Sequence, residues 1–202
     1  MAVVENLFVY GPWCKGGLQF QLLEPYVENL SEAYILGRCL RTHVGYPVYL
    51  SQGTDRIPGQ LVTLRGPDLL WRLLEEFHAV HPTHPERGLY QRLTREVVLV
   101  NSEERLLATV FAVSESQVNS SWGPVLAGDW RLCLKTTPAL PERMTPRQKN
   151  YIQRLGRSTG REIIPIDLDL YRELMKLQLI VDKGRRLALS PLGREVLRYL
   201  PT

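Results

Sequence analysis

Three of the four histidines in the chain, His78, His81 and His84, lie within the segment LEEFHAVHPTHPERGLYQR (74–92). Imidazole nitrogens bind zinc, and histidine is also a general base near neutral pH. Two features argue against a metal site. The three histidines extend from the end of a helix into a proline-containing loop, where their rings need not converge, and no cysteine is close enough in sequence to complete a ligand set. We therefore expect no metal site, and favour a polar loop covering the mouth of a pocket.

A helix must position these side chains. Asp68 is a suitable first residue, and apolar side chains recur after it at helical spacing. They are Leu69, Leu70, Leu73, Leu74 and Phe77. At about 100° per residue, this stripe leaves Glu75 pointing outward and places Glu76 and His78 at its two edges, where both could reach a cleft. Two prolines after His78 end the helix.

The remainder of the first 136 residues reads as strands separated by glycine and proline turns. Strands are predicted at 6–11, 33–44, 46–51, 59–64, 90–100 and 105–113, and a helix limited or kinked by Pro25 at 18–27. The four residues NSEE between the last two strands suffice for a hairpin. Many strands with local connections and few helices predict an α+β fold, built on a curved or barrel-like mixed sheet.

A proline-rich segment, TPALPERMTPRQ (137–148), marks a change of pattern. We predict one domain at 1–136, a linker at 137–143 and a second domain at 144–202. In the second domain, capping signals begin helices after Thr145, Asp167 and Ser190, and a turn at 182–184 joins two short strands. Helix, helix, two-stranded wing and closing helix is the outline of a winged-helix-like module.

Charge differs between these two parts. From residue 144 onward there are twelve Lys and Arg against six Asp and Glu, a balance of +6, whereas residues 1–143 balance at −2. Such a contrast suggests modules with different partners. Overall, 44% hydrophobic and 23% charged residues are ordinary globular values. No apolar run approaches the roughly 20 residues that span a bilayer. The N-terminus lacks the features of a signal peptide, and three widely spaced cysteines suggest free thiols, so we expect a cytoplasmic protein.

Two stretches of the first domain, LFVYGPWCKGG (7–17) and LLEEFHAV with LYQR (73–92), resemble motifs of the γ-glutamylcyclotransferase family, which includes the AIG2-like and γ-glutamylamine cyclotransferases. The family has F-x-Y-G-[ST]-L and a glycine after its first strand, then a helix ending L-D-x-F-E-G, then Y-x-R opening a long strand. The first motif corresponds to Phe8, Val9, Tyr10, Gly11, Pro12, Trp13 and Gly16, and the later ones to Leu74–Ala79 and Tyr90–Arg92.

The resemblance implies a mechanism and a pocket. Backbone N–H groups of the Y-G-[ST]-L loop would hold the substrate carboxylate, and the helix glutamate would take a proton from the α-amine that attacks the γ-carbonyl, giving 5-oxoproline. No cofactor is expected. The residues expected to line the pocket or bind a small γ-glutamyl-like ligand are Tyr10, Gly11, Pro12, Trp13, Gly16, Tyr90 and Arg92. Tyr10 and Tyr90 are equally compatible with a role as core aromatics, and Arg92 with that of a solvated strand charge.

This sequence departs from the family pattern at its chemical positions. His78 stands where the family has its working glutamate, and Pro12 removes a backbone N–H from the loop that would bind the carboxylate. Trp13 adds bulk beside it. We therefore expect a pocket that remains while the original reaction is lost, and a binding or regulatory role. The rival hypothesis is an active cyclotransferase that uses His78 or Glu76 as its base.

For the second domain, protein docking and DNA binding are both open. The helix before the wing, which would enter the major groove, begins with acidic residues that repel phosphates: Asp167, Asp169 and Glu173. The basic residues gather in the first helix and the wing: Arg147, Lys149, Arg154, Arg157, Lys183, Arg185 and Arg186. This placement favours a protein partner over a transcription-linked DNA-binding regulator.

Overall fold

The computed structural model describes residues 4–158, 163–184 and 186–200. The chain divides into two compact units, Met1–Thr137 and Pro138–Thr202. Within the described ranges, no helix has both the length and the apolar character needed to cross a membrane.

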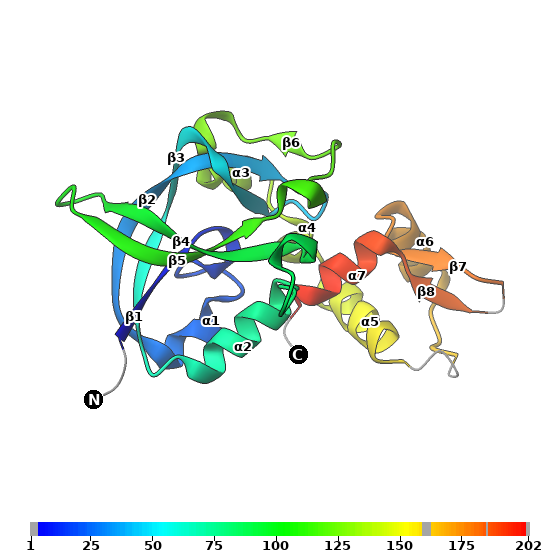
Figure 1. Cartoon of the computed structure of the whole chain (residues 1–202). Helices are drawn as coiled ribbons and strands as arrows, with labels where there is room; N and C mark the ends of the chain where they lie inside the picture. Colours follow the sequence, from blue (N-terminus) through cyan, green and yellow to red (C-terminus); the bar gives the residue numbers. More distant parts are fainter. Residues whose placement is uncertain (1–3, 159–162, 185, 201–202) are drawn as a thin grey trace. The chain divides into compact units, whose positions relative to one another are not determined.

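A closed five-stranded barrel forms the first unit (Figure 1). Its strands are β1 (Val4–Val9), β2 (Val27–Arg41), β3 (Pro47–Arg65), β4 (Tyr90–Leu99) and β5 (Arg105–Val113). They follow the order β3-β1-β5-β4-β2, and β2 pairs back to β3, which closes the barrel. Only β1 and β5 run parallel among these neighbours. The predicted α+β fold with a mixed barrel is confirmed, and the short strand β6 (Gly123–Pro124) adds to the edge of β2.

One pair of predicted strands is a single element. The polar residues between 51 and 58 suggested a break, but β3 runs through them. Its residues 51–54 form a bulge between Leu50, which pairs with Arg38, and Asp55, which pairs with Gly37. The change of register falls between Gly37 and Arg38, and Gly53 opposite adopts a φ of +123° that favours glycine. The prediction of separate strands was wrong because an exposed polar bulge inside a strand carries the same residue types as a turn between two strands.

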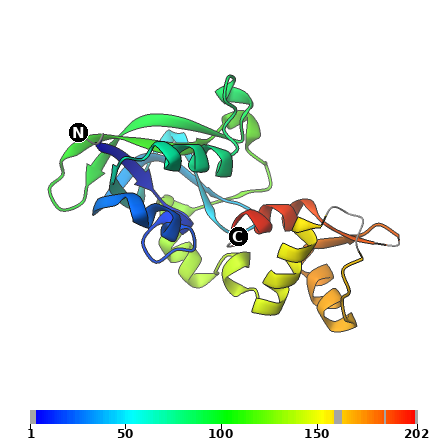
Figure 2. The same ribbon diagram turned by 90° about the horizontal axis from the view of Figure 1, so that it is seen from below.

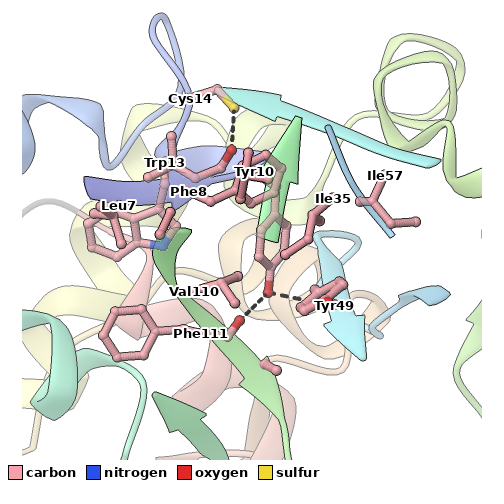
Figure 3. Close-up of a cluster of buried hydrophobic side chains, with 14 of the residues drawn as sticks. Leu7, Phe8, Tyr10, Trp13, Cys14, Ile35, Tyr49, Ile57, Val110 and Phe111 are labelled. Carbon is pink, nitrogen blue, oxygen red and sulfur yellow. Dashed lines mark hydrogen bonds between the residues drawn. The ribbon is translucent and has the colours of Figure 1, made fainter. Parts of the chain in front are cut away.

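The barrel core joins β1, β3 and β5 (Figure 3). The Tyr10 hydroxyl donates to the Phe111 carbonyl at 3.0 Å and accepts from the Tyr49 backbone N–H at 3.1 Å. It therefore ties three strands together where the first strand ends. The largest fully buried side chains include Tyr46, Tyr49, Phe8, Leu7, Ile35, Ile57 and Leu64.

Helices of the first unit are α1 (Phe20–Leu23), α2 (Asp68–Phe77) and α3 (Trp130–Thr136). Short 3-10 turns are η1 (Gly11–Trp13), η2 (Glu24–Tyr26), η3 (Pro85–Arg87), η4 (Glu115–Gln117) and η5 (Leu126–Gly128). Pro25 interrupts the predicted helix at 18–27, which shortens to α1 and η2. Both α1 and α2 lie on the lower side of the barrel in Figure 1, and Figure 2 views α2 in front of the strands.

The buried face of α2 differs from the predicted stripe. Leu69 and Leu73 are 69% and 40% exposed, whereas Trp71 is buried with Leu70 and Leu74. Adding Phe77 and His78, which follow at helical spacing, completes this face. The helix carries apolar residues on more than half of its circumference, so the sequence alone left two nearly equal choices of face.

The second unit contains α4 (Leu140–Arg143), α5 (Pro146–Arg157), α6 (Leu168–Lys176), β7 (Ile180–Asp182), β8 (Leu187–Leu189) and α7 (Pro191–Arg198). The predicted caps are present: Thr145 and Gln148 form a reciprocal capping box, Asp167 accepts from the Leu170 N–H, and Ser190 accepts from the Gly193 N–H. Part of the segment predicted as a linker is helical, as α4.

Candidate functional site

The end of α2 directs His78 into the barrel. Its backbone N–H still bonds to the Leu74 carbonyl at 2.9 Å, and the chain then turns through Ala79, whose φ is +48°. The next N–H groups close this end, from Ala79 to Glu76 and from Val80 to Glu75. A left-handed residue after the last helical turn is the usual way to reverse the chain. The family motif has glycine here, so this chain keeps the turn with a residue less suited to it.

The His78 imidazole is buried among aromatic rings. It is 6% exposed and stacks on Phe111, with ring centroids 4.1 Å apart and planes within 6°. Trp13 lies roughly parallel at 5.5 Å, and Tyr90 presents its edge at 4.9 Å. Nδ1 lies 2.8 Å from the Leu74 carbonyl oxygen, which only accepts, so Nδ1 carries a proton and donates. The ring is therefore packed and oriented as a core side chain.

Phe111 was not among the predicted site residues. It lies on β5 opposite Arg92 in the β4–β5 hairpin, two residues before the strand ends. Its stack on His78 forms because the barrel brings β5 close to the end of α2. Such a contact between distant parts of the chain leaves no pattern in the nearby sequence. Burial along β5 is continuous from Val110 to Val113, so an alternating pattern does not single out Phe111.

The loop after β1 is occupied by its own hydrogen bonds. Trp13 N–H points to the Tyr10 carbonyl at 3.4 Å, and Cys14 N–H to the Gly11 carbonyl at 3.3 Å. Lys15 N–H donates to the Gln60 side chain at 2.8 Å. Pro12 has no N–H, and the backbone N–H groups at 13 to 15, which could have faced a carboxylate, already have partners in the loop or on β3.

Trp13 fills most of the space beside His78. The indole is buried and presents a T-shaped contact to Phe77 at 4.9 Å. Figure 3 shows it in the same cluster as Leu7 and Phe111. The cavity that remains is about 20 Å³, and its lining residues are Leu7, Phe8, Val9, Tyr10, Trp13, Leu74, His78 and Phe111. One water needs about 10–15 Å³ in this measure, whereas ligand pockets are typically about 300–1,000 Å³.

The other predicted residues lie around this cavity or apart from it. Tyr90 contacts His78 by its ring edge. Arg92 is on the outer side, where it pairs with Glu75 at 3.0 Å and covers the Trp71 ring at 3.9 Å. Glu76 is exposed, and Gly16 is exposed beyond the turn of the loop. The structure thus brings Tyr10, Trp13 and His78 together around the cavity. The predicted residues outside its lining are Gly11, Pro12, Gly16, Glu76, Tyr90 and Arg92.

His78 lies apart from His81 and His84, whose ring centroids are 5.4 Å from each other. His78 points into the core, whereas His81 and His84 lie in the loop that follows, where His81 Nδ1 accepts from the backbone N–H groups of Thr83 and His84. Across the described residues, no group of three or more His, Cys, Asp or Glu side chains is arranged to hold a metal ion.

Cys14 sits beside the loop as a buried thiol. Its sulfur donates to the Val9 carbonyl at 3.5 Å, and burial raises its pKa to about 12 (Figure 3). The thiolate is the nucleophilic form of cysteine, so this group is held in its unreactive state.

In the second unit, most of the acidic side chains of α6 have internal partners. Asp167 caps the helix and pairs with Arg147, and Glu173 accepts from the Gln148 side chain at 3.0 Å. The Leu170 N–H and Arg147 hold the pKa of Asp167 below its usual value. Arg185, one of the predicted basic wing residues, lies outside the described residues.

A model of the family described as γ-glutamyl cyclotransferase, AIG2-like, matches residues 7–132, which is more than half of the chain. A comparison with curated protein sequences gives no match. Similar solved structures include an AIG2-like protein from Mus musculus, with 14% identity, a TM-score of 0.44, and coverage of 59% of this chain and 82% of that one. An Arabidopsis thaliana protein has 16% identity, a TM-score of 0.47, and coverage of 82% and 94%. YkqA from Bacillus subtilis has 17% identity, a TM-score of 0.49, and coverage of 67% and 42%.

Proposed function

Because the chain belongs to the γ-glutamyl cyclotransferase, AIG2-like family, we propose that its first unit is a cyclotransferase fold that has lost the cyclisation reaction and that the protein acts by binding. The observation that carries the proposal is the packing of His78, the residue at the position of the family glutamate. A general base must reach the proton that it removes, in an accessible and correctly placed position. The His78 ring instead packs against Phe111 and Trp13 and donates from Nδ1 to its own helix.

The state of the substrate-binding loop supports the same conclusion. The family reaction requires preorganised donors for a carboxylate and space for a γ-glutamyl group. Here the N–H groups of Trp13, Cys14 and Lys15 have partners within the unit, and the residual cavity of about 20 Å³ is at the scale of a single water. Changes at Pro12, Trp13 and His78 therefore act on base, anion loop and volume together.

For the second unit we propose a protein-docking role. The module carries a positive balance of charge, yet the exposed cations are not concentrated on α6, the helix before the hairpin. Arg147 is paired with Asp167 there, and Asp169 remains exposed near the start of the helix. A helix with carboxylates in its first turn is poorly suited to phosphates. A peptide or protein surface is the better-matched partner.

The rival is an active cyclotransferase, in which the site opens and His78 or Glu76 accepts the substrate proton. Ligand binding separates the two proposals. All four tryptophans, Trp13, Trp71, Trp122 and Trp130, lie in the first unit, so tryptophan fluorescence follows its unfolding alone. A ligand at 100 times its Kd stabilises the folded state by about 2.7 kcal/mol.

We expect no shift of the fluorescence-detected unfolding temperature when γ-glutamyl amino acids or γ-glutamylamines are added at millimolar concentration. Trp13→Leu, which restores the family residue and enlarges the cavity, is the matched comparison. A saturable upward shift for the unaltered protein would contradict the loss of the substrate site, whatever the result for the variant.

A further inference from the structure

An open groove runs through the second unit. Its volume is about 620 Å³, within the typical range of ligand and peptide clefts. Its apolar lining residues are Leu155, Ile163, Ile164, Pro165, Ile166, Leu187, Ala188, Leu189 and Leu197. Figures 1 and 2 show α7 next to α5, with the β7–β8 hairpin extending from the start of α7. Ile163 is 77% exposed, so part of this apolar surface faces solvent.

The groove follows the edge of β8. Successive side chains of a strand point to opposite faces, so lining by three successive residues, Leu187 to Leu189, places the groove along the strand and not over one face. The hydrogen bonds fix which backbone groups point there. Lys183 N–H donates to the Arg186 carbonyl, and Ser190 N–H to the Leu179 carbonyl. In the antiparallel alternation, Ala188 therefore faces β7, while Leu187 and Leu189 direct their N–H and C=O groups outward.

This outer edge is available for pairing. The Leu189 carbonyl accepts from the Arg194 side chain at 3.0 Å. The remaining outward groups are the N–H and C=O of Leu187 and the N–H of Leu189. Among the residues that the structure describes, none outside the hairpin bonds to these three groups. Unpaired backbone groups on a sheet edge are a template for another strand.

The opposite wall does not complete the sheet. Tyr151 on α5 donates its hydroxyl to the Ile164 carbonyl at 3.2 Å, which holds the segment 163–166 across the groove from β8. Pro165 in this segment has no N–H to offer. In the described part of the chain, β8 pairs with β7 alone. The result is a two-stranded sheet beside an apolar channel with a fixed far wall.

The charged groups at this groove are mainly cationic. Arg186 and Arg194 line it, and both are exposed; the acidic residue among the lining residues is Asp182 at the hairpin end. Arg154 and Arg157 are exposed on α5, which forms another wall. An occupant with carboxylates at the rim and apolar side chains toward the floor matches this distribution. A nucleic-acid backbone would place phosphates against isoleucine and leucine.

We propose that the groove binds an extended segment of a partner protein, which adds to β8 as a third strand. This inference rests on the proposed docking role and specifies its surface. The segment donates to the Leu187 carbonyl and accepts from the N–H groups of Leu187 and Leu189. Its apolar side chains pack toward Leu155, Leu187 and Leu197, and its acidic side chains approach Arg186 and Arg194. Backbone pairing supplies affinity in such complexes, and side-chain pockets supply selectivity.

The test is a selection of random peptides displayed on phage against the full-length protein, followed by fluorescence anisotropy with the best synthetic peptide. We expect enrichment of sequences that alternate apolar residues with Asp or Glu. N-methylation of the alternate peptide nitrogens that face β8 removes backbone donors and should weaken binding at least tenfold. N-methylation of the intervening nitrogens should leave binding within about twofold.

Protein variants test the same surface. Leu187→Pro removes an outward N–H without removing a β7–β8 bond, so it should abolish binding, whereas Leu187→Ala keeps the donor and should retain most of it. Arg186→Glu should weaken binding about tenfold, which corresponds to about 1.4 kcal/mol. Arg172→Glu, the same charge change on α6 away from the groove, is the matched control.

The outcomes separate this inference from the broader docking role. Peptide binding that changes neither with N-methylation at either set of nitrogens nor with the groove variants would overturn the β8 site. Protein docking elsewhere on the unit would remain supported. Absence of enrichment would overturn the β8 site as well. A further outcome is that duplex DNA binds to the full-length protein and displaces the peptide, with DNA binding lost in Arg186→Glu and kept in Arg172→Glu. That result would overturn both the β8 site and the docking role in favour of nucleic-acid binding.

Discussion

Replacing His78 distinguishes a packed core residue from a catalytic base. His78→Ala removes a ring with four aromatic neighbours: Phe111 at 4.1 Å, Tyr90 at 4.9 Å, Phe77 at 5.2 Å and Trp13 at 5.5 Å. Each such pair contributes about 0.5–1.5 kcal/mol. A large buried aromatic truncated to alanine costs about 3–5 kcal/mol in total, including the cavity left behind. Because the imidazole is smaller than those rings, we expect a loss of about 3 kcal/mol.

His78→Phe is the matched variant. It preserves a flat ring for the stacks and loses the bond from Nδ1, but the Leu74 carbonyl still accepts from the residue 78 backbone N–H at 2.9 Å. No buried acceptor is left without a partner, so the change should stay within about 1 kcal/mol.

Urea unfolding followed by tryptophan fluorescence measures both variants, because the four tryptophans report on the first unit. For a unit of this size, 3 kcal/mol corresponds to a fall of about 10 °C in Tm. A neutral or stabilising His78→Ala together with a destabilising His78→Phe would show that His78 is not a packed core residue. It is the pattern of a functional side chain held at the expense of stability.

Further predictions concern thiols, backbone strain and metal. Burial raises the pKa of both Cys14 and Cys39 to about 12, so these thiols stay protonated at pH 8. A thiol reagent should therefore modify the partly exposed Cys133 first in the native protein. Equal modification rates for all three cysteines, measured by peptide mass spectrometry, would contradict this. Ala79→Gly should stabilise the first unit by about 1 kcal/mol in urea titrations, because φ at this position is +48°, and a loss of stability would refute the strain. Protein purified without a histidine tag should hold well under one equivalent of zinc by elemental analysis, and stoichiometric zinc would overturn this expectation.

Much of the fold followed from local patterns. The hairpin of β4 and β5 and the caps at Thr145, Asp167 and Ser190 depend on residues close in sequence, and these were predicted. The barrel as a class followed from strands with local connections. The continuous β3 and the buried face of α2 did not follow, because an exposed bulge resembles a turn and an apolar helix offers more than one face.

The site was predictable in part. The motif positions of Tyr10, Trp13 and His78 were identified from the sequence, and the structure brings them together around one cavity. The sequence did not indicate how completely side chains fill the cavity beside His78. The stack of Phe111 on His78 and the T-shaped contact of Trp13 with Phe77 depend on how β5, η1 and α2 meet in space. An open pocket was expected, and the cavity has a water-sized volume instead.

The most direct test of the lost reaction is a quantitative assay of 5-oxoproline released from γ-glutamyl amino acids and γ-glutamylamines. An active family member should be assayed in parallel. We expect no release above the level of the His78→Phe protein, which should remain folded. Turnover by the unaltered protein that His78→Phe abolishes, with its unfolding curve unchanged, would instead identify His78 as a working base.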